Sequence, residues 1–331
     1  MSLERVVGWI VGGLLVALFI IEFILHGLYG AIMLRSFVRK LPFNVEAHPQ
    51  NPDAERIEFP TTNGLTLRGS LRRQVDGPSR GLIIFCPELG GEHWSADWYA
   101  SSLLKDGFDL LAFDFRNQGE SDAAKRYDPL HWLTEFEVED VLAAIAYSQT
   151  RDDLKELPVG LLGISRGGSA ALAAATRCPE IQCVATEGAF STRGLFMHFT
   201  LRWAVLYAPE WLMRILPTWH LKWTSAMVRR VAEFQRRCRY TRLQRSLPRL
   251  ANTPTLLIAG QRDSYVTPEI TRQMCEYIGD GPHEMWLVAR AKHNMARHVD
   301  SDVYDAKLSA FFSQMAVDTV RQEVIRQTDA V

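Results

Sequence analysis

The pattern of hydrophobic positions divides the chain into an apolar start, a short irregular stretch and a long region of alternating elements. Residues Val6 to Leu34 are apolar apart from Glu22 and His26, and this run is longer than the roughly 20 residues that span a bilayer. It is too long for the apolar part of a signal peptide, and no small-residue cleavage site follows it. We therefore expect residues 1–40 to be a transmembrane anchor with its basic flank.

The charges beside this run predict its orientation. Arg35, Arg39 and Lys40 follow the apolar residues directly, and the next acid is Glu46. Because cytoplasmic flanks carry the excess of Lys and Arg, we expect a single-pass membrane protein whose C-terminal part lies on the cytoplasmic side. Glu22 is either a functional group within the span or a side chain close to an interface, since intramembrane charge is costly.

After residues 41–55, a proline-containing stretch expected to be a linker, the pattern changes to strands and helices. The segment "RIEFPTTNGLTLRGSLRR" alternates polar and apolar residues around a Thr-Asn-Gly turn, which predicts an antiparallel hairpin. Short apolar runs follow, separated by amphipathic stretches such as 131–148 and 268–277: "GLIIFC", "FDLLAFDF", "PVGLLGI", "QCVATEG", "TPTLLIAG" and "HEMWLVA". Such alternation indicates βαβ units and a parallel sheet covered on both faces.

One insertion interrupts this alternation. Between Phe190 and Pro254 no strand pattern occurs, and the segment is far longer than an ordinary connection within a sheet. We expect a helical cap over residues 190–252, which divides a core into 56–189 and 253–316 and leaves 317–331 as a tail.

The cap segment is strongly basic. Between Trp211 and Arg249, arginines and lysines recur with Glu233 as the one acid, and Trp219 and Trp223 lie among them. This pattern fits an amphipathic surface on anionic lipid headgroups. It also fits a solvated helical lid whose aromatic side chains pack on the core.

Composition narrows the functional classes. With 331 residues, 47% of them hydrophobic, the chain can bury a sizeable core. Its net charge of −1 and pI of about 6.8 argue against a nucleic-acid binder. The five cysteines are scattered without CxxC spacing, so we expect free thiols in a reducing compartment and neither a disulfide framework nor a metal site.

The candidate chemistry begins at Ser165. It lies in Gly163-Ile164-Ser165-Arg166-Gly167, directly after an apolar strand and directly before a helix rich in small residues. A serine at such a sharp strand-to-helix turn is exposed as a nucleophile, and the glycines keep neighbouring side chains away from it. A serine hydroxyl also needs an adjacent base, held in turn by a third group.

Candidates for the base and the acid follow later strands. His293 comes at the carboxyl end of the run "MWLVA", where a sheet enzyme places its base, and His298 is the alternative one turn further on. Asp263 follows "TLLIAG" and preserves the chain order Ser, Asp, His. Glu187, at the end of an earlier strand, is the alternative acid.

An acyl-transfer site also needs backbone N–H groups to hold a developing oxyanion. The amide of Arg166, next to the serine, is one candidate. The loop "PELGGEHW" after the first parallel strand offers the second, from Glu88 or Leu89.

These residues resemble the α/β-hydrolase superfamily over about Arg56 to Gln314. The segment "FDFRNQGESD" is similar to that of the serine-aminopeptidase-like or Bem46-like membrane-anchored branch. The resemblance implies an α/β-hydrolase fold with a mostly parallel eight-stranded sheet and hydrolysis without a cofactor. It also implies that Asp114, Arg116 and Ser121 hold a loop beneath the site. Cys86-Pro87 stands where many members have His-Gly.

The sequence thus predicts a membrane-anchored serine hydrolase that cleaves carboxylic ester or thioester substrates with lipid-like acyl groups through Ser165, His293 and Asp263. Its expected partners are that substrate and the bilayer, with no cofactor, metal or nucleic acid. Two alternatives remain open: a serine peptidase or amidase of the same mechanism, and a non-catalytic membrane-tethered interaction protein. The sequence does not indicate an oligomeric state.

Overall fold

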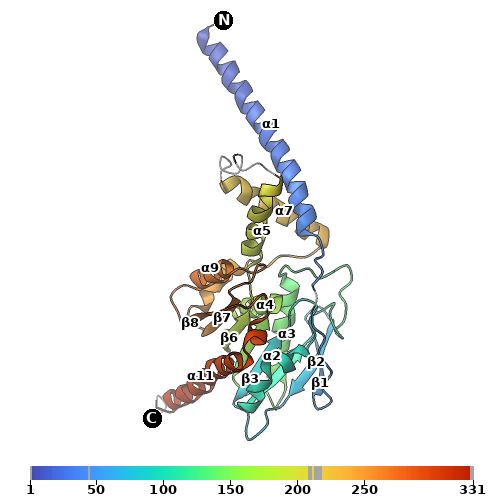
Figure 1. Ribbon diagram of the computed structural model, residues 1–331, viewed down its shortest axis with the longest axis vertical. Coiled ribbons are helices and arrows are strands. Elements are labelled where there is room, and N and C mark those ends of the chain that lie inside the picture. Colours follow the sequence, from blue (N-terminus) through green and yellow to red (C-terminus); the bar gives the residue numbers. More distant parts are fainter. Residues whose placement is uncertain (1, 44, 208–210, 212–217, 329–331) are drawn as a thin grey trace. The chain divides into compact units, whose positions relative to one another are not determined.

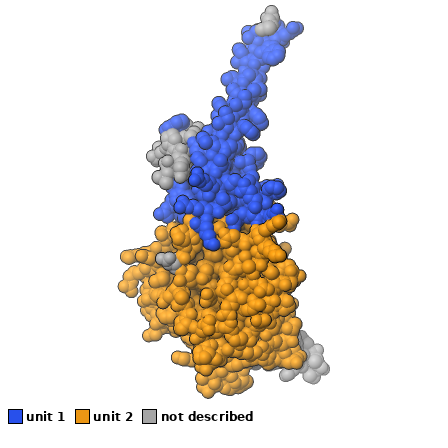
Figure 2. Space-filling view, turned by 90° about the vertical axis from the view of Figure 1, so that its right-hand side faces the viewer, with its two compact units in different colours: residues 1–40, 196–237 blue, residues 41–195, 238–331 orange. Residues whose placement is uncertain are grey.

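The computed structural model describes residues 2–43, 45–207, 211 and 218–328 (Figure 1). Its contacts group the chain into two compact units, coloured separately in Figure 2. The first combines residues 1–40 with 196–237, and the second combines 41–195 with 238–331. The predicted cap of 190–252 is therefore divided between the two, since its middle part, 196–237, belongs to the first unit and its ends belong to the second.

Among the described residues, eight strands form one sheet in the order β1-β2-β4-β3-β5-β6-β7-β8. Strands β1 and β2 form the antiparallel hairpin, β2 is antiparallel to β4, and the remaining neighbours are parallel. The strands are β1 (Glu55–Pro60), β2 (Thr66–Arg72), β3 (Gly81–Cys86), β4 (Phe108–Phe113), β5 (Val159–Ile164), β6 (Ile181–Glu187), β7 (Thr255–Gly260) and β8 (His283–Val288). The hairpin and the parallel strands predicted from the pattern are confirmed.

Helices cover both faces of this sheet. Every residue of β3, β4, β5 and β7 is buried, which explains their continuous apolar sequences. On one face pack α3 (Glu135–Thr150), α4 (Arg166–Ala175) and α9 (Pro268–Ile278), with the short α8 (Leu243–Ser246) and the 3₁₀ helix η1 (Leu247–Leu250). On the other pack α2 (Ser95–Lys105), α10 (Ala296–Val299) and α11 (Ser301–Thr328).

One helix boundary differs from the sequence-based expectation. Helix α3 begins at Glu135, not His131, because Thr134 caps it: the Thr134 side chain accepts from the Phe136 amide, and Glu137 accepts from the Thr134 amide.

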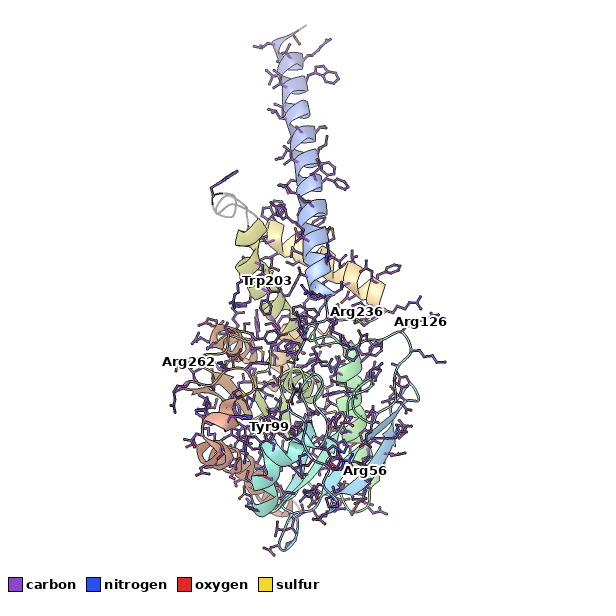
Figure 3. All side chains as sticks on the ribbon, turned by 45° about the vertical axis from the view of Figure 1, so that its right-hand side comes forward. Arg56, Tyr99, Arg126, Trp203, Arg236 and Arg262 are labelled. Atoms are coloured by element: carbon purple, nitrogen blue, oxygen red, sulfur yellow. The ribbon has the colours of Figure 1, made fainter. Side chains whose placement is uncertain are left out.

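The first unit consists of α1 (Leu3–Phe37), α7 (Thr218–Arg236) and most of α5 (Thr192–Tyr207). Residues 208–210 and 212–217 of the predicted cap lie outside the described residues. Helix α1 is long and apolar enough to cross a membrane, with a mean hydropathy of 2.4 over its most apolar 18-residue window. Its side chains from Leu3 to Ile21 are exposed except for Val6 (Figure 3). Those residues rise about 28 Å at 1.5 Å each.

From Glu22 onwards one face of α1 packs against α7. The contacts recur at one helical turn, at Glu22, His26 and Gly30. A Cβ at Gly30 would lie 3.0 Å from Cε of Met227, so glycine allows the two helices to approach closely. Helix α1 and part of the predicted cap, which look unrelated in the sequence, thus form one packed unit.

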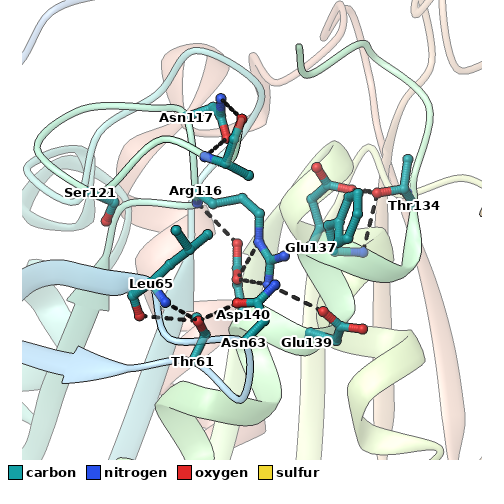
Figure 4. A network of polar contacts seen from close by, with 12 residues as sticks. Thr61, Asn63, Leu65, Arg116, Asn117, Ser121, Thr134, Glu137, Glu139 and Asp140 are labelled. Atoms are coloured by element: carbon teal, nitrogen blue, oxygen red, sulfur yellow. Dashed lines mark hydrogen bonds and ion pairs between the residues drawn. The ribbon is translucent and has the colours of Figure 1, made fainter. Parts of the chain in front are cut away.

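A buried ion pair fixes the loop after β4 (Figure 4). The Arg116 guanidinium donates to Oδ1 of Asp140 at 2.6 and 2.8 Å, and both side chains are fully buried. Asp114 accepts from the His93 and Glu120 amides, while Ser121 donates to the Asp114 carbonyl. These contacts connect the loop to α3 and to the segment preceding α2.

We predict that Arg116→Met destabilises the protein by about 3–5 kcal/mol, because it leaves the Asp140 carboxylate buried and unpaired. The double variant Arg116→Met/Asp140→Leu should recover much of this loss, because it removes both charges. As a control, Glu120→Gln alters the exposed ion pair with Arg56 and should change stability by less than about 1 kcal/mol. Thermal unfolding in detergent measures all three. A double variant as unstable as the single one would contradict this explanation.

Candidate active site

Ser165 lies at the turn between β5 and α4, in a backbone conformation that is unfavourable for a residue with a Cβ. Its φ and ψ are 51° and −117°, and such conformations cost of order 1–3 kcal/mol. The surrounding structure holds the turn: the Ser165 amide donates to the Glu187 carbonyl of β6 at 2.7 Å. The strain directs the side chain outward from the end of the strand.

The flanking glycines are required by contacts between backbones. A Cβ at Gly167 would lie 2.2 Å from the Pro87 carbonyl oxygen, and one at Gly163 would lie 2.6 Å from Cα of Gly168. Neither contact is possible for alanine. The Arg166 side chain also supports the turn, because it is buried and donates to the Leu130 carbonyl at 2.8 Å.

The fold brings Ser165, His293 and Asp263 into one chain of hydrogen bonds. The Ser165 Oγ lies 2.9 Å from Nε2 of His293, whose Nδ1 lies 2.7 Å from Oδ2 of Asp263. The other carboxylate oxygen of Asp263 accepts from the amides of Tyr265 and Val266, each at 2.8 Å. Asp263 therefore has a fixed orientation, and its position favours the tautomer in which Nδ1 of His293 carries the proton.

The two alternative residues make other contacts, although His298 also lines the pocket at Ser165. His298 is on α10, where its ring packs 4.9 Å from that of Trp98 and its Nε2 lies 3.5 Å from Glu46. Glu187 is fully buried, and its Oε1 accepts from the Ala296 amide at 2.8 Å. The hydrogen bond on Nδ1 of His293 is thus made by Asp263 and not by Glu187.

The loop after β3 provides the other candidate groups. Glu88, Leu89 and Arg166 line the same pocket as Ser165. Cys86, the last residue of β3, is buried, and the Gly91 amide closes a turn onto the Glu88 carbonyl at 3.0 Å. The Cys-Pro sequence is therefore compatible with a loop that approaches the turn at Ser165.

A pocket of about 430 Å³ opens at Ser165 and His293. Its apolar lining includes Phe43, Val45, Leu89, Trp98 and Met295. Tyr99 of α2, labelled in Figure 3, also lines it. The volume and lining suit the apolar part of a small substrate beside the serine.

Part of this pocket comes from the segment that the sequence analysis expects to be a linker. The ring of Phe43 packs edge-on against Tyr265 at 5.4 Å, and Tyr265 packs against His293 at 5.0 Å. Further along, Asn51 donates to Asp97 at 2.6 Å. No periodicity marks these residues in the sequence, and their role follows only from the fold.

Two carboxyl groups are buried close to the site. Burial raises the pKa of Glu187 to about 7, and burial also raises the pKa of Glu88. The Ala296 amide and the nearby His293 oppose the shift at Glu187.

Comparison with known proteins agrees with this architecture. Residues 81–214 match a family model described as the alpha/beta hydrolase fold. The esterase Pf2001 of Pyrococcus furiosus superposes with a TM-score of 0.60 at 20% identity, covering 83% of this chain and 97% of that one. The chain has the α/β-hydrolase fold.

Curated relatives match part of this α/β-hydrolase domain. A thiohydrolase of Aspergillus aculeatus, aneE, is 32% identical over 122 residues, which is 36% of this chain and 36% of its own length. An acyltransferase of Aspergillus calidoustus, drtE, is 32% identical over 136 residues, or 40% of this chain and 42% of its own. The chain thus matches well under half of each of these relatives.

The raised pKa of Glu187 gives a prediction for stability. From its ordinary pKa of 4.5 up to about pH 7, the folded protein keeps a proton that the unfolded chain releases. Stability should therefore fall as the pH rises through this window, by about 3 kcal/mol in total. Glu187→Gln removes this dependence. The melting temperature of the variant minus that of wild type should therefore be larger at pH 8 than at pH 5. An unchanged difference would contradict the prediction, and the exposed Glu156→Gln is the control.

Proposed function

We propose that this protein is a membrane-anchored serine hydrolase that cleaves carboxylic ester or thioester substrates with apolar acyl groups. The observation that carries the proposal is the hydrogen-bonded chain from Ser165 through His293 to Asp263, at the mouth of an apolar pocket. The similarity to a thiohydrolase and to the fold of an esterase supports the same class.

In the proposed reaction, Nε2 of His293 takes the proton of Ser165 as Oγ attacks the acyl carbonyl. The imidazolium that forms is stabilised by Asp263 on its Nδ1 side. The tetrahedral intermediate then breaks its bond to the leaving oxygen or sulfur, which receives the proton from His293. Water, deprotonated by the same ring, attacks the resulting acyl-serine and releases the acid.

Backbone amides would hold the negative oxygen of the intermediate. The amide of Arg166 follows the nucleophile at the start of α4, where the positive end of the helix dipole also favours an anion. Glu88 or Leu89, which line the same pocket, would supply the second amide. Each such donor is worth about 2.7–4 kcal/mol of transition-state stabilisation.

Attachment to a membrane is proposed from two features of the first unit. Residues Val7–Ile21 of α1 are apolar and exposed and rise about 22 Å, most of the thickness of a bilayer core. Helix α7 exposes Trp219, Trp223 and Phe234, by 57, 62 and 86%, close to basic residues such as Arg230. Exposed aromatic and basic side chains on one helix suit a lipid headgroup surface. The basic residues after α1 favour a cytoplasmic catalytic domain.

A fluorophosphonate probe tests the proposed nucleophile. We expect covalent labelling of the full-length protein in detergent, complete loss of labelling in Ser165→Ala, and a reduction of about 10⁴-fold in ester turnover for Asp263→Asn. Ser169→Ala is the control, because Ser169 follows in the same helix and donates to the Ser165 carbonyl. Equal labelling of wild type and Ser165→Ala would refute the assignment, and faster cleavage of aminoacyl amides than of esters would overturn the substrate class.

Phe43 should set the preference for acyl length. Phe43→Ala removes an apolar wall of the pocket, so kcat/KM for an octanoyl ester should fall by about tenfold or more while that for an acetyl ester stays nearly unchanged. Phe234→Ala, which truncates an exposed ring in the other unit, should alter neither ester. Equal losses for both chain lengths would show that Phe43 has no role in acyl selection.

A further inference from the structure

We propose that Glu22, His26 and His220 bind a divalent cation of the zinc type between helices α1 and α7. This site is separate from the serine chemistry, since all three residues belong to the unit that contains the anchor. The scattered cysteines predict no metal site, and these three ligands give no motif because His220 lies almost two hundred residues from Glu22 and His26.

The three side chains converge on one point. One ligand atom from each, a carboxylate oxygen and two imidazole nitrogens, lies within 4.8 Å of the others. Glu22 and His26 are one turn apart on the same face of α1, and His220 faces them from α7. Two histidines and a carboxylate are a common protein ligand set for zinc, which leaves a fourth position for water.

The hydrogen bonds around His26 fix which of its nitrogens carries the proton. The Thr224 hydroxyl donates to the His220 carbonyl at 2.9 Å, so its oxygen can only accept from Nδ1 of His26, at 2.7 Å. The neutral ring then presents the lone pair of Nε2 toward Oε2 of Glu22, at 3.5 Å. Two acceptors that face each other repel unless a cation lies between them.

Protonation of the two histidine rings does not satisfy this arrangement. The rings of His26 and His220 stack nearly parallel, with centroids 4.0 Å apart and an interplanar angle of 12°. Two imidazolium ions at that separation would repel strongly in a site that is 1% exposed at His220. Within the described part of the chain, Nδ1 of His220 has no hydrogen-bond partner, and its Nε2 makes only the ion-pair contact with Glu22 at 2.9 Å.

A divalent cation would satisfy the Glu22 carboxylate and both imidazole rings together. It would take the lone pairs of both neutral rings and one carboxylate oxygen, and its charge would offset the repulsion among them. Bonds of about 2.0–2.2 Å require the three atoms to approach one another and the rings to splay from their stack, through rotation of the side chains. Thr224 would then orient His26 through its second nitrogen, as outer hydrogen bonds do for metal-bound histidines.

The chemical consequence is a cross-link between anchor and cap. Glu22 lies where the exposed stretch of α1 ends and its packing against α7 begins. A cation held there would stabilise this helix pair and allow a charged residue at the end of the apolar span.

Metal binding to the full-length protein tests the proposal. The protein is purified in detergent without a histidine tag, dialysed against ZnCl₂ and analysed for zinc per chain. We expect one zinc per wild-type chain and none in His26→Gln/His220→Gln, whereas His283→Gln, a histidine change in β8, should retain one. Thr224→Val should weaken binding about 10–100-fold. No stoichiometric zinc in wild type, or wild-type binding by the double variant, would overturn the site.

Further measurements guard against misfolding. Far-ultraviolet circular dichroism reports whether the helices of the double variant are folded, and fluorophosphonate labelling at Ser165 reports on the other unit. Wild-type protein loaded with Co²⁺ should give the intense visible absorption of a four-coordinate site, and this spectrum needs no variant. Weak octahedral absorption alone would also overturn the proposal.

Discussion

The candidate site depends on how closely three backbone segments approach one another at the end of the sheet. Gly163 lies against the start of α4, and Gly167 lies against the Cys86-Pro87 segment. Both contacts are shorter than a Cβ would allow. The turn is strained, and its buried neighbours hold it in place, including the Glu187 carbonyl that accepts from the Ser165 amide. Asp263 and His293 follow β7 and β8, which are neighbours in the sheet, and His293 lies within hydrogen-bond distance of the serine.

A second constraint concerns the helix before this domain. Helix α1 is exposed and apolar along its first half, and its second half packs against α7 through Glu22, His26 and Gly30. The polar residues that interrupt the apolar sequence are therefore located where packing against protein replaces exposure. In the sheet-containing unit, Phe43 and Val45 follow this helix in the sequence and line the pocket at Ser165.

The local pattern of apolar and polar residues was sufficient to predict most strands and the candidate site residues. Buried parallel strands are continuous apolar runs, so β3, β5 and β7 could be predicted closely, and the Gly163–Gly167 motif together with strand order selected Ser165, His293 and Asp263 for the candidate site. Other features arise only from contacts between distant segments. Neither the pairing of His220 with Glu22 nor the packing of Phe43 on Tyr265 has a periodic signal, and the start of α3 depended on one threonine cap.

The most direct test of the central claim is to observe the covalent intermediate. The full-length protein is mixed with a p-nitrophenyl acyl ester, quenched in acid at early times and measured by intact-protein and peptide mass spectrometry. We expect one added acyl group, on the peptide that contains Ser165, in step with nitrophenol release. Nitrophenol release at the same rate with the acyl group on another residue, or persisting in Ser165→Ala, would contradict it.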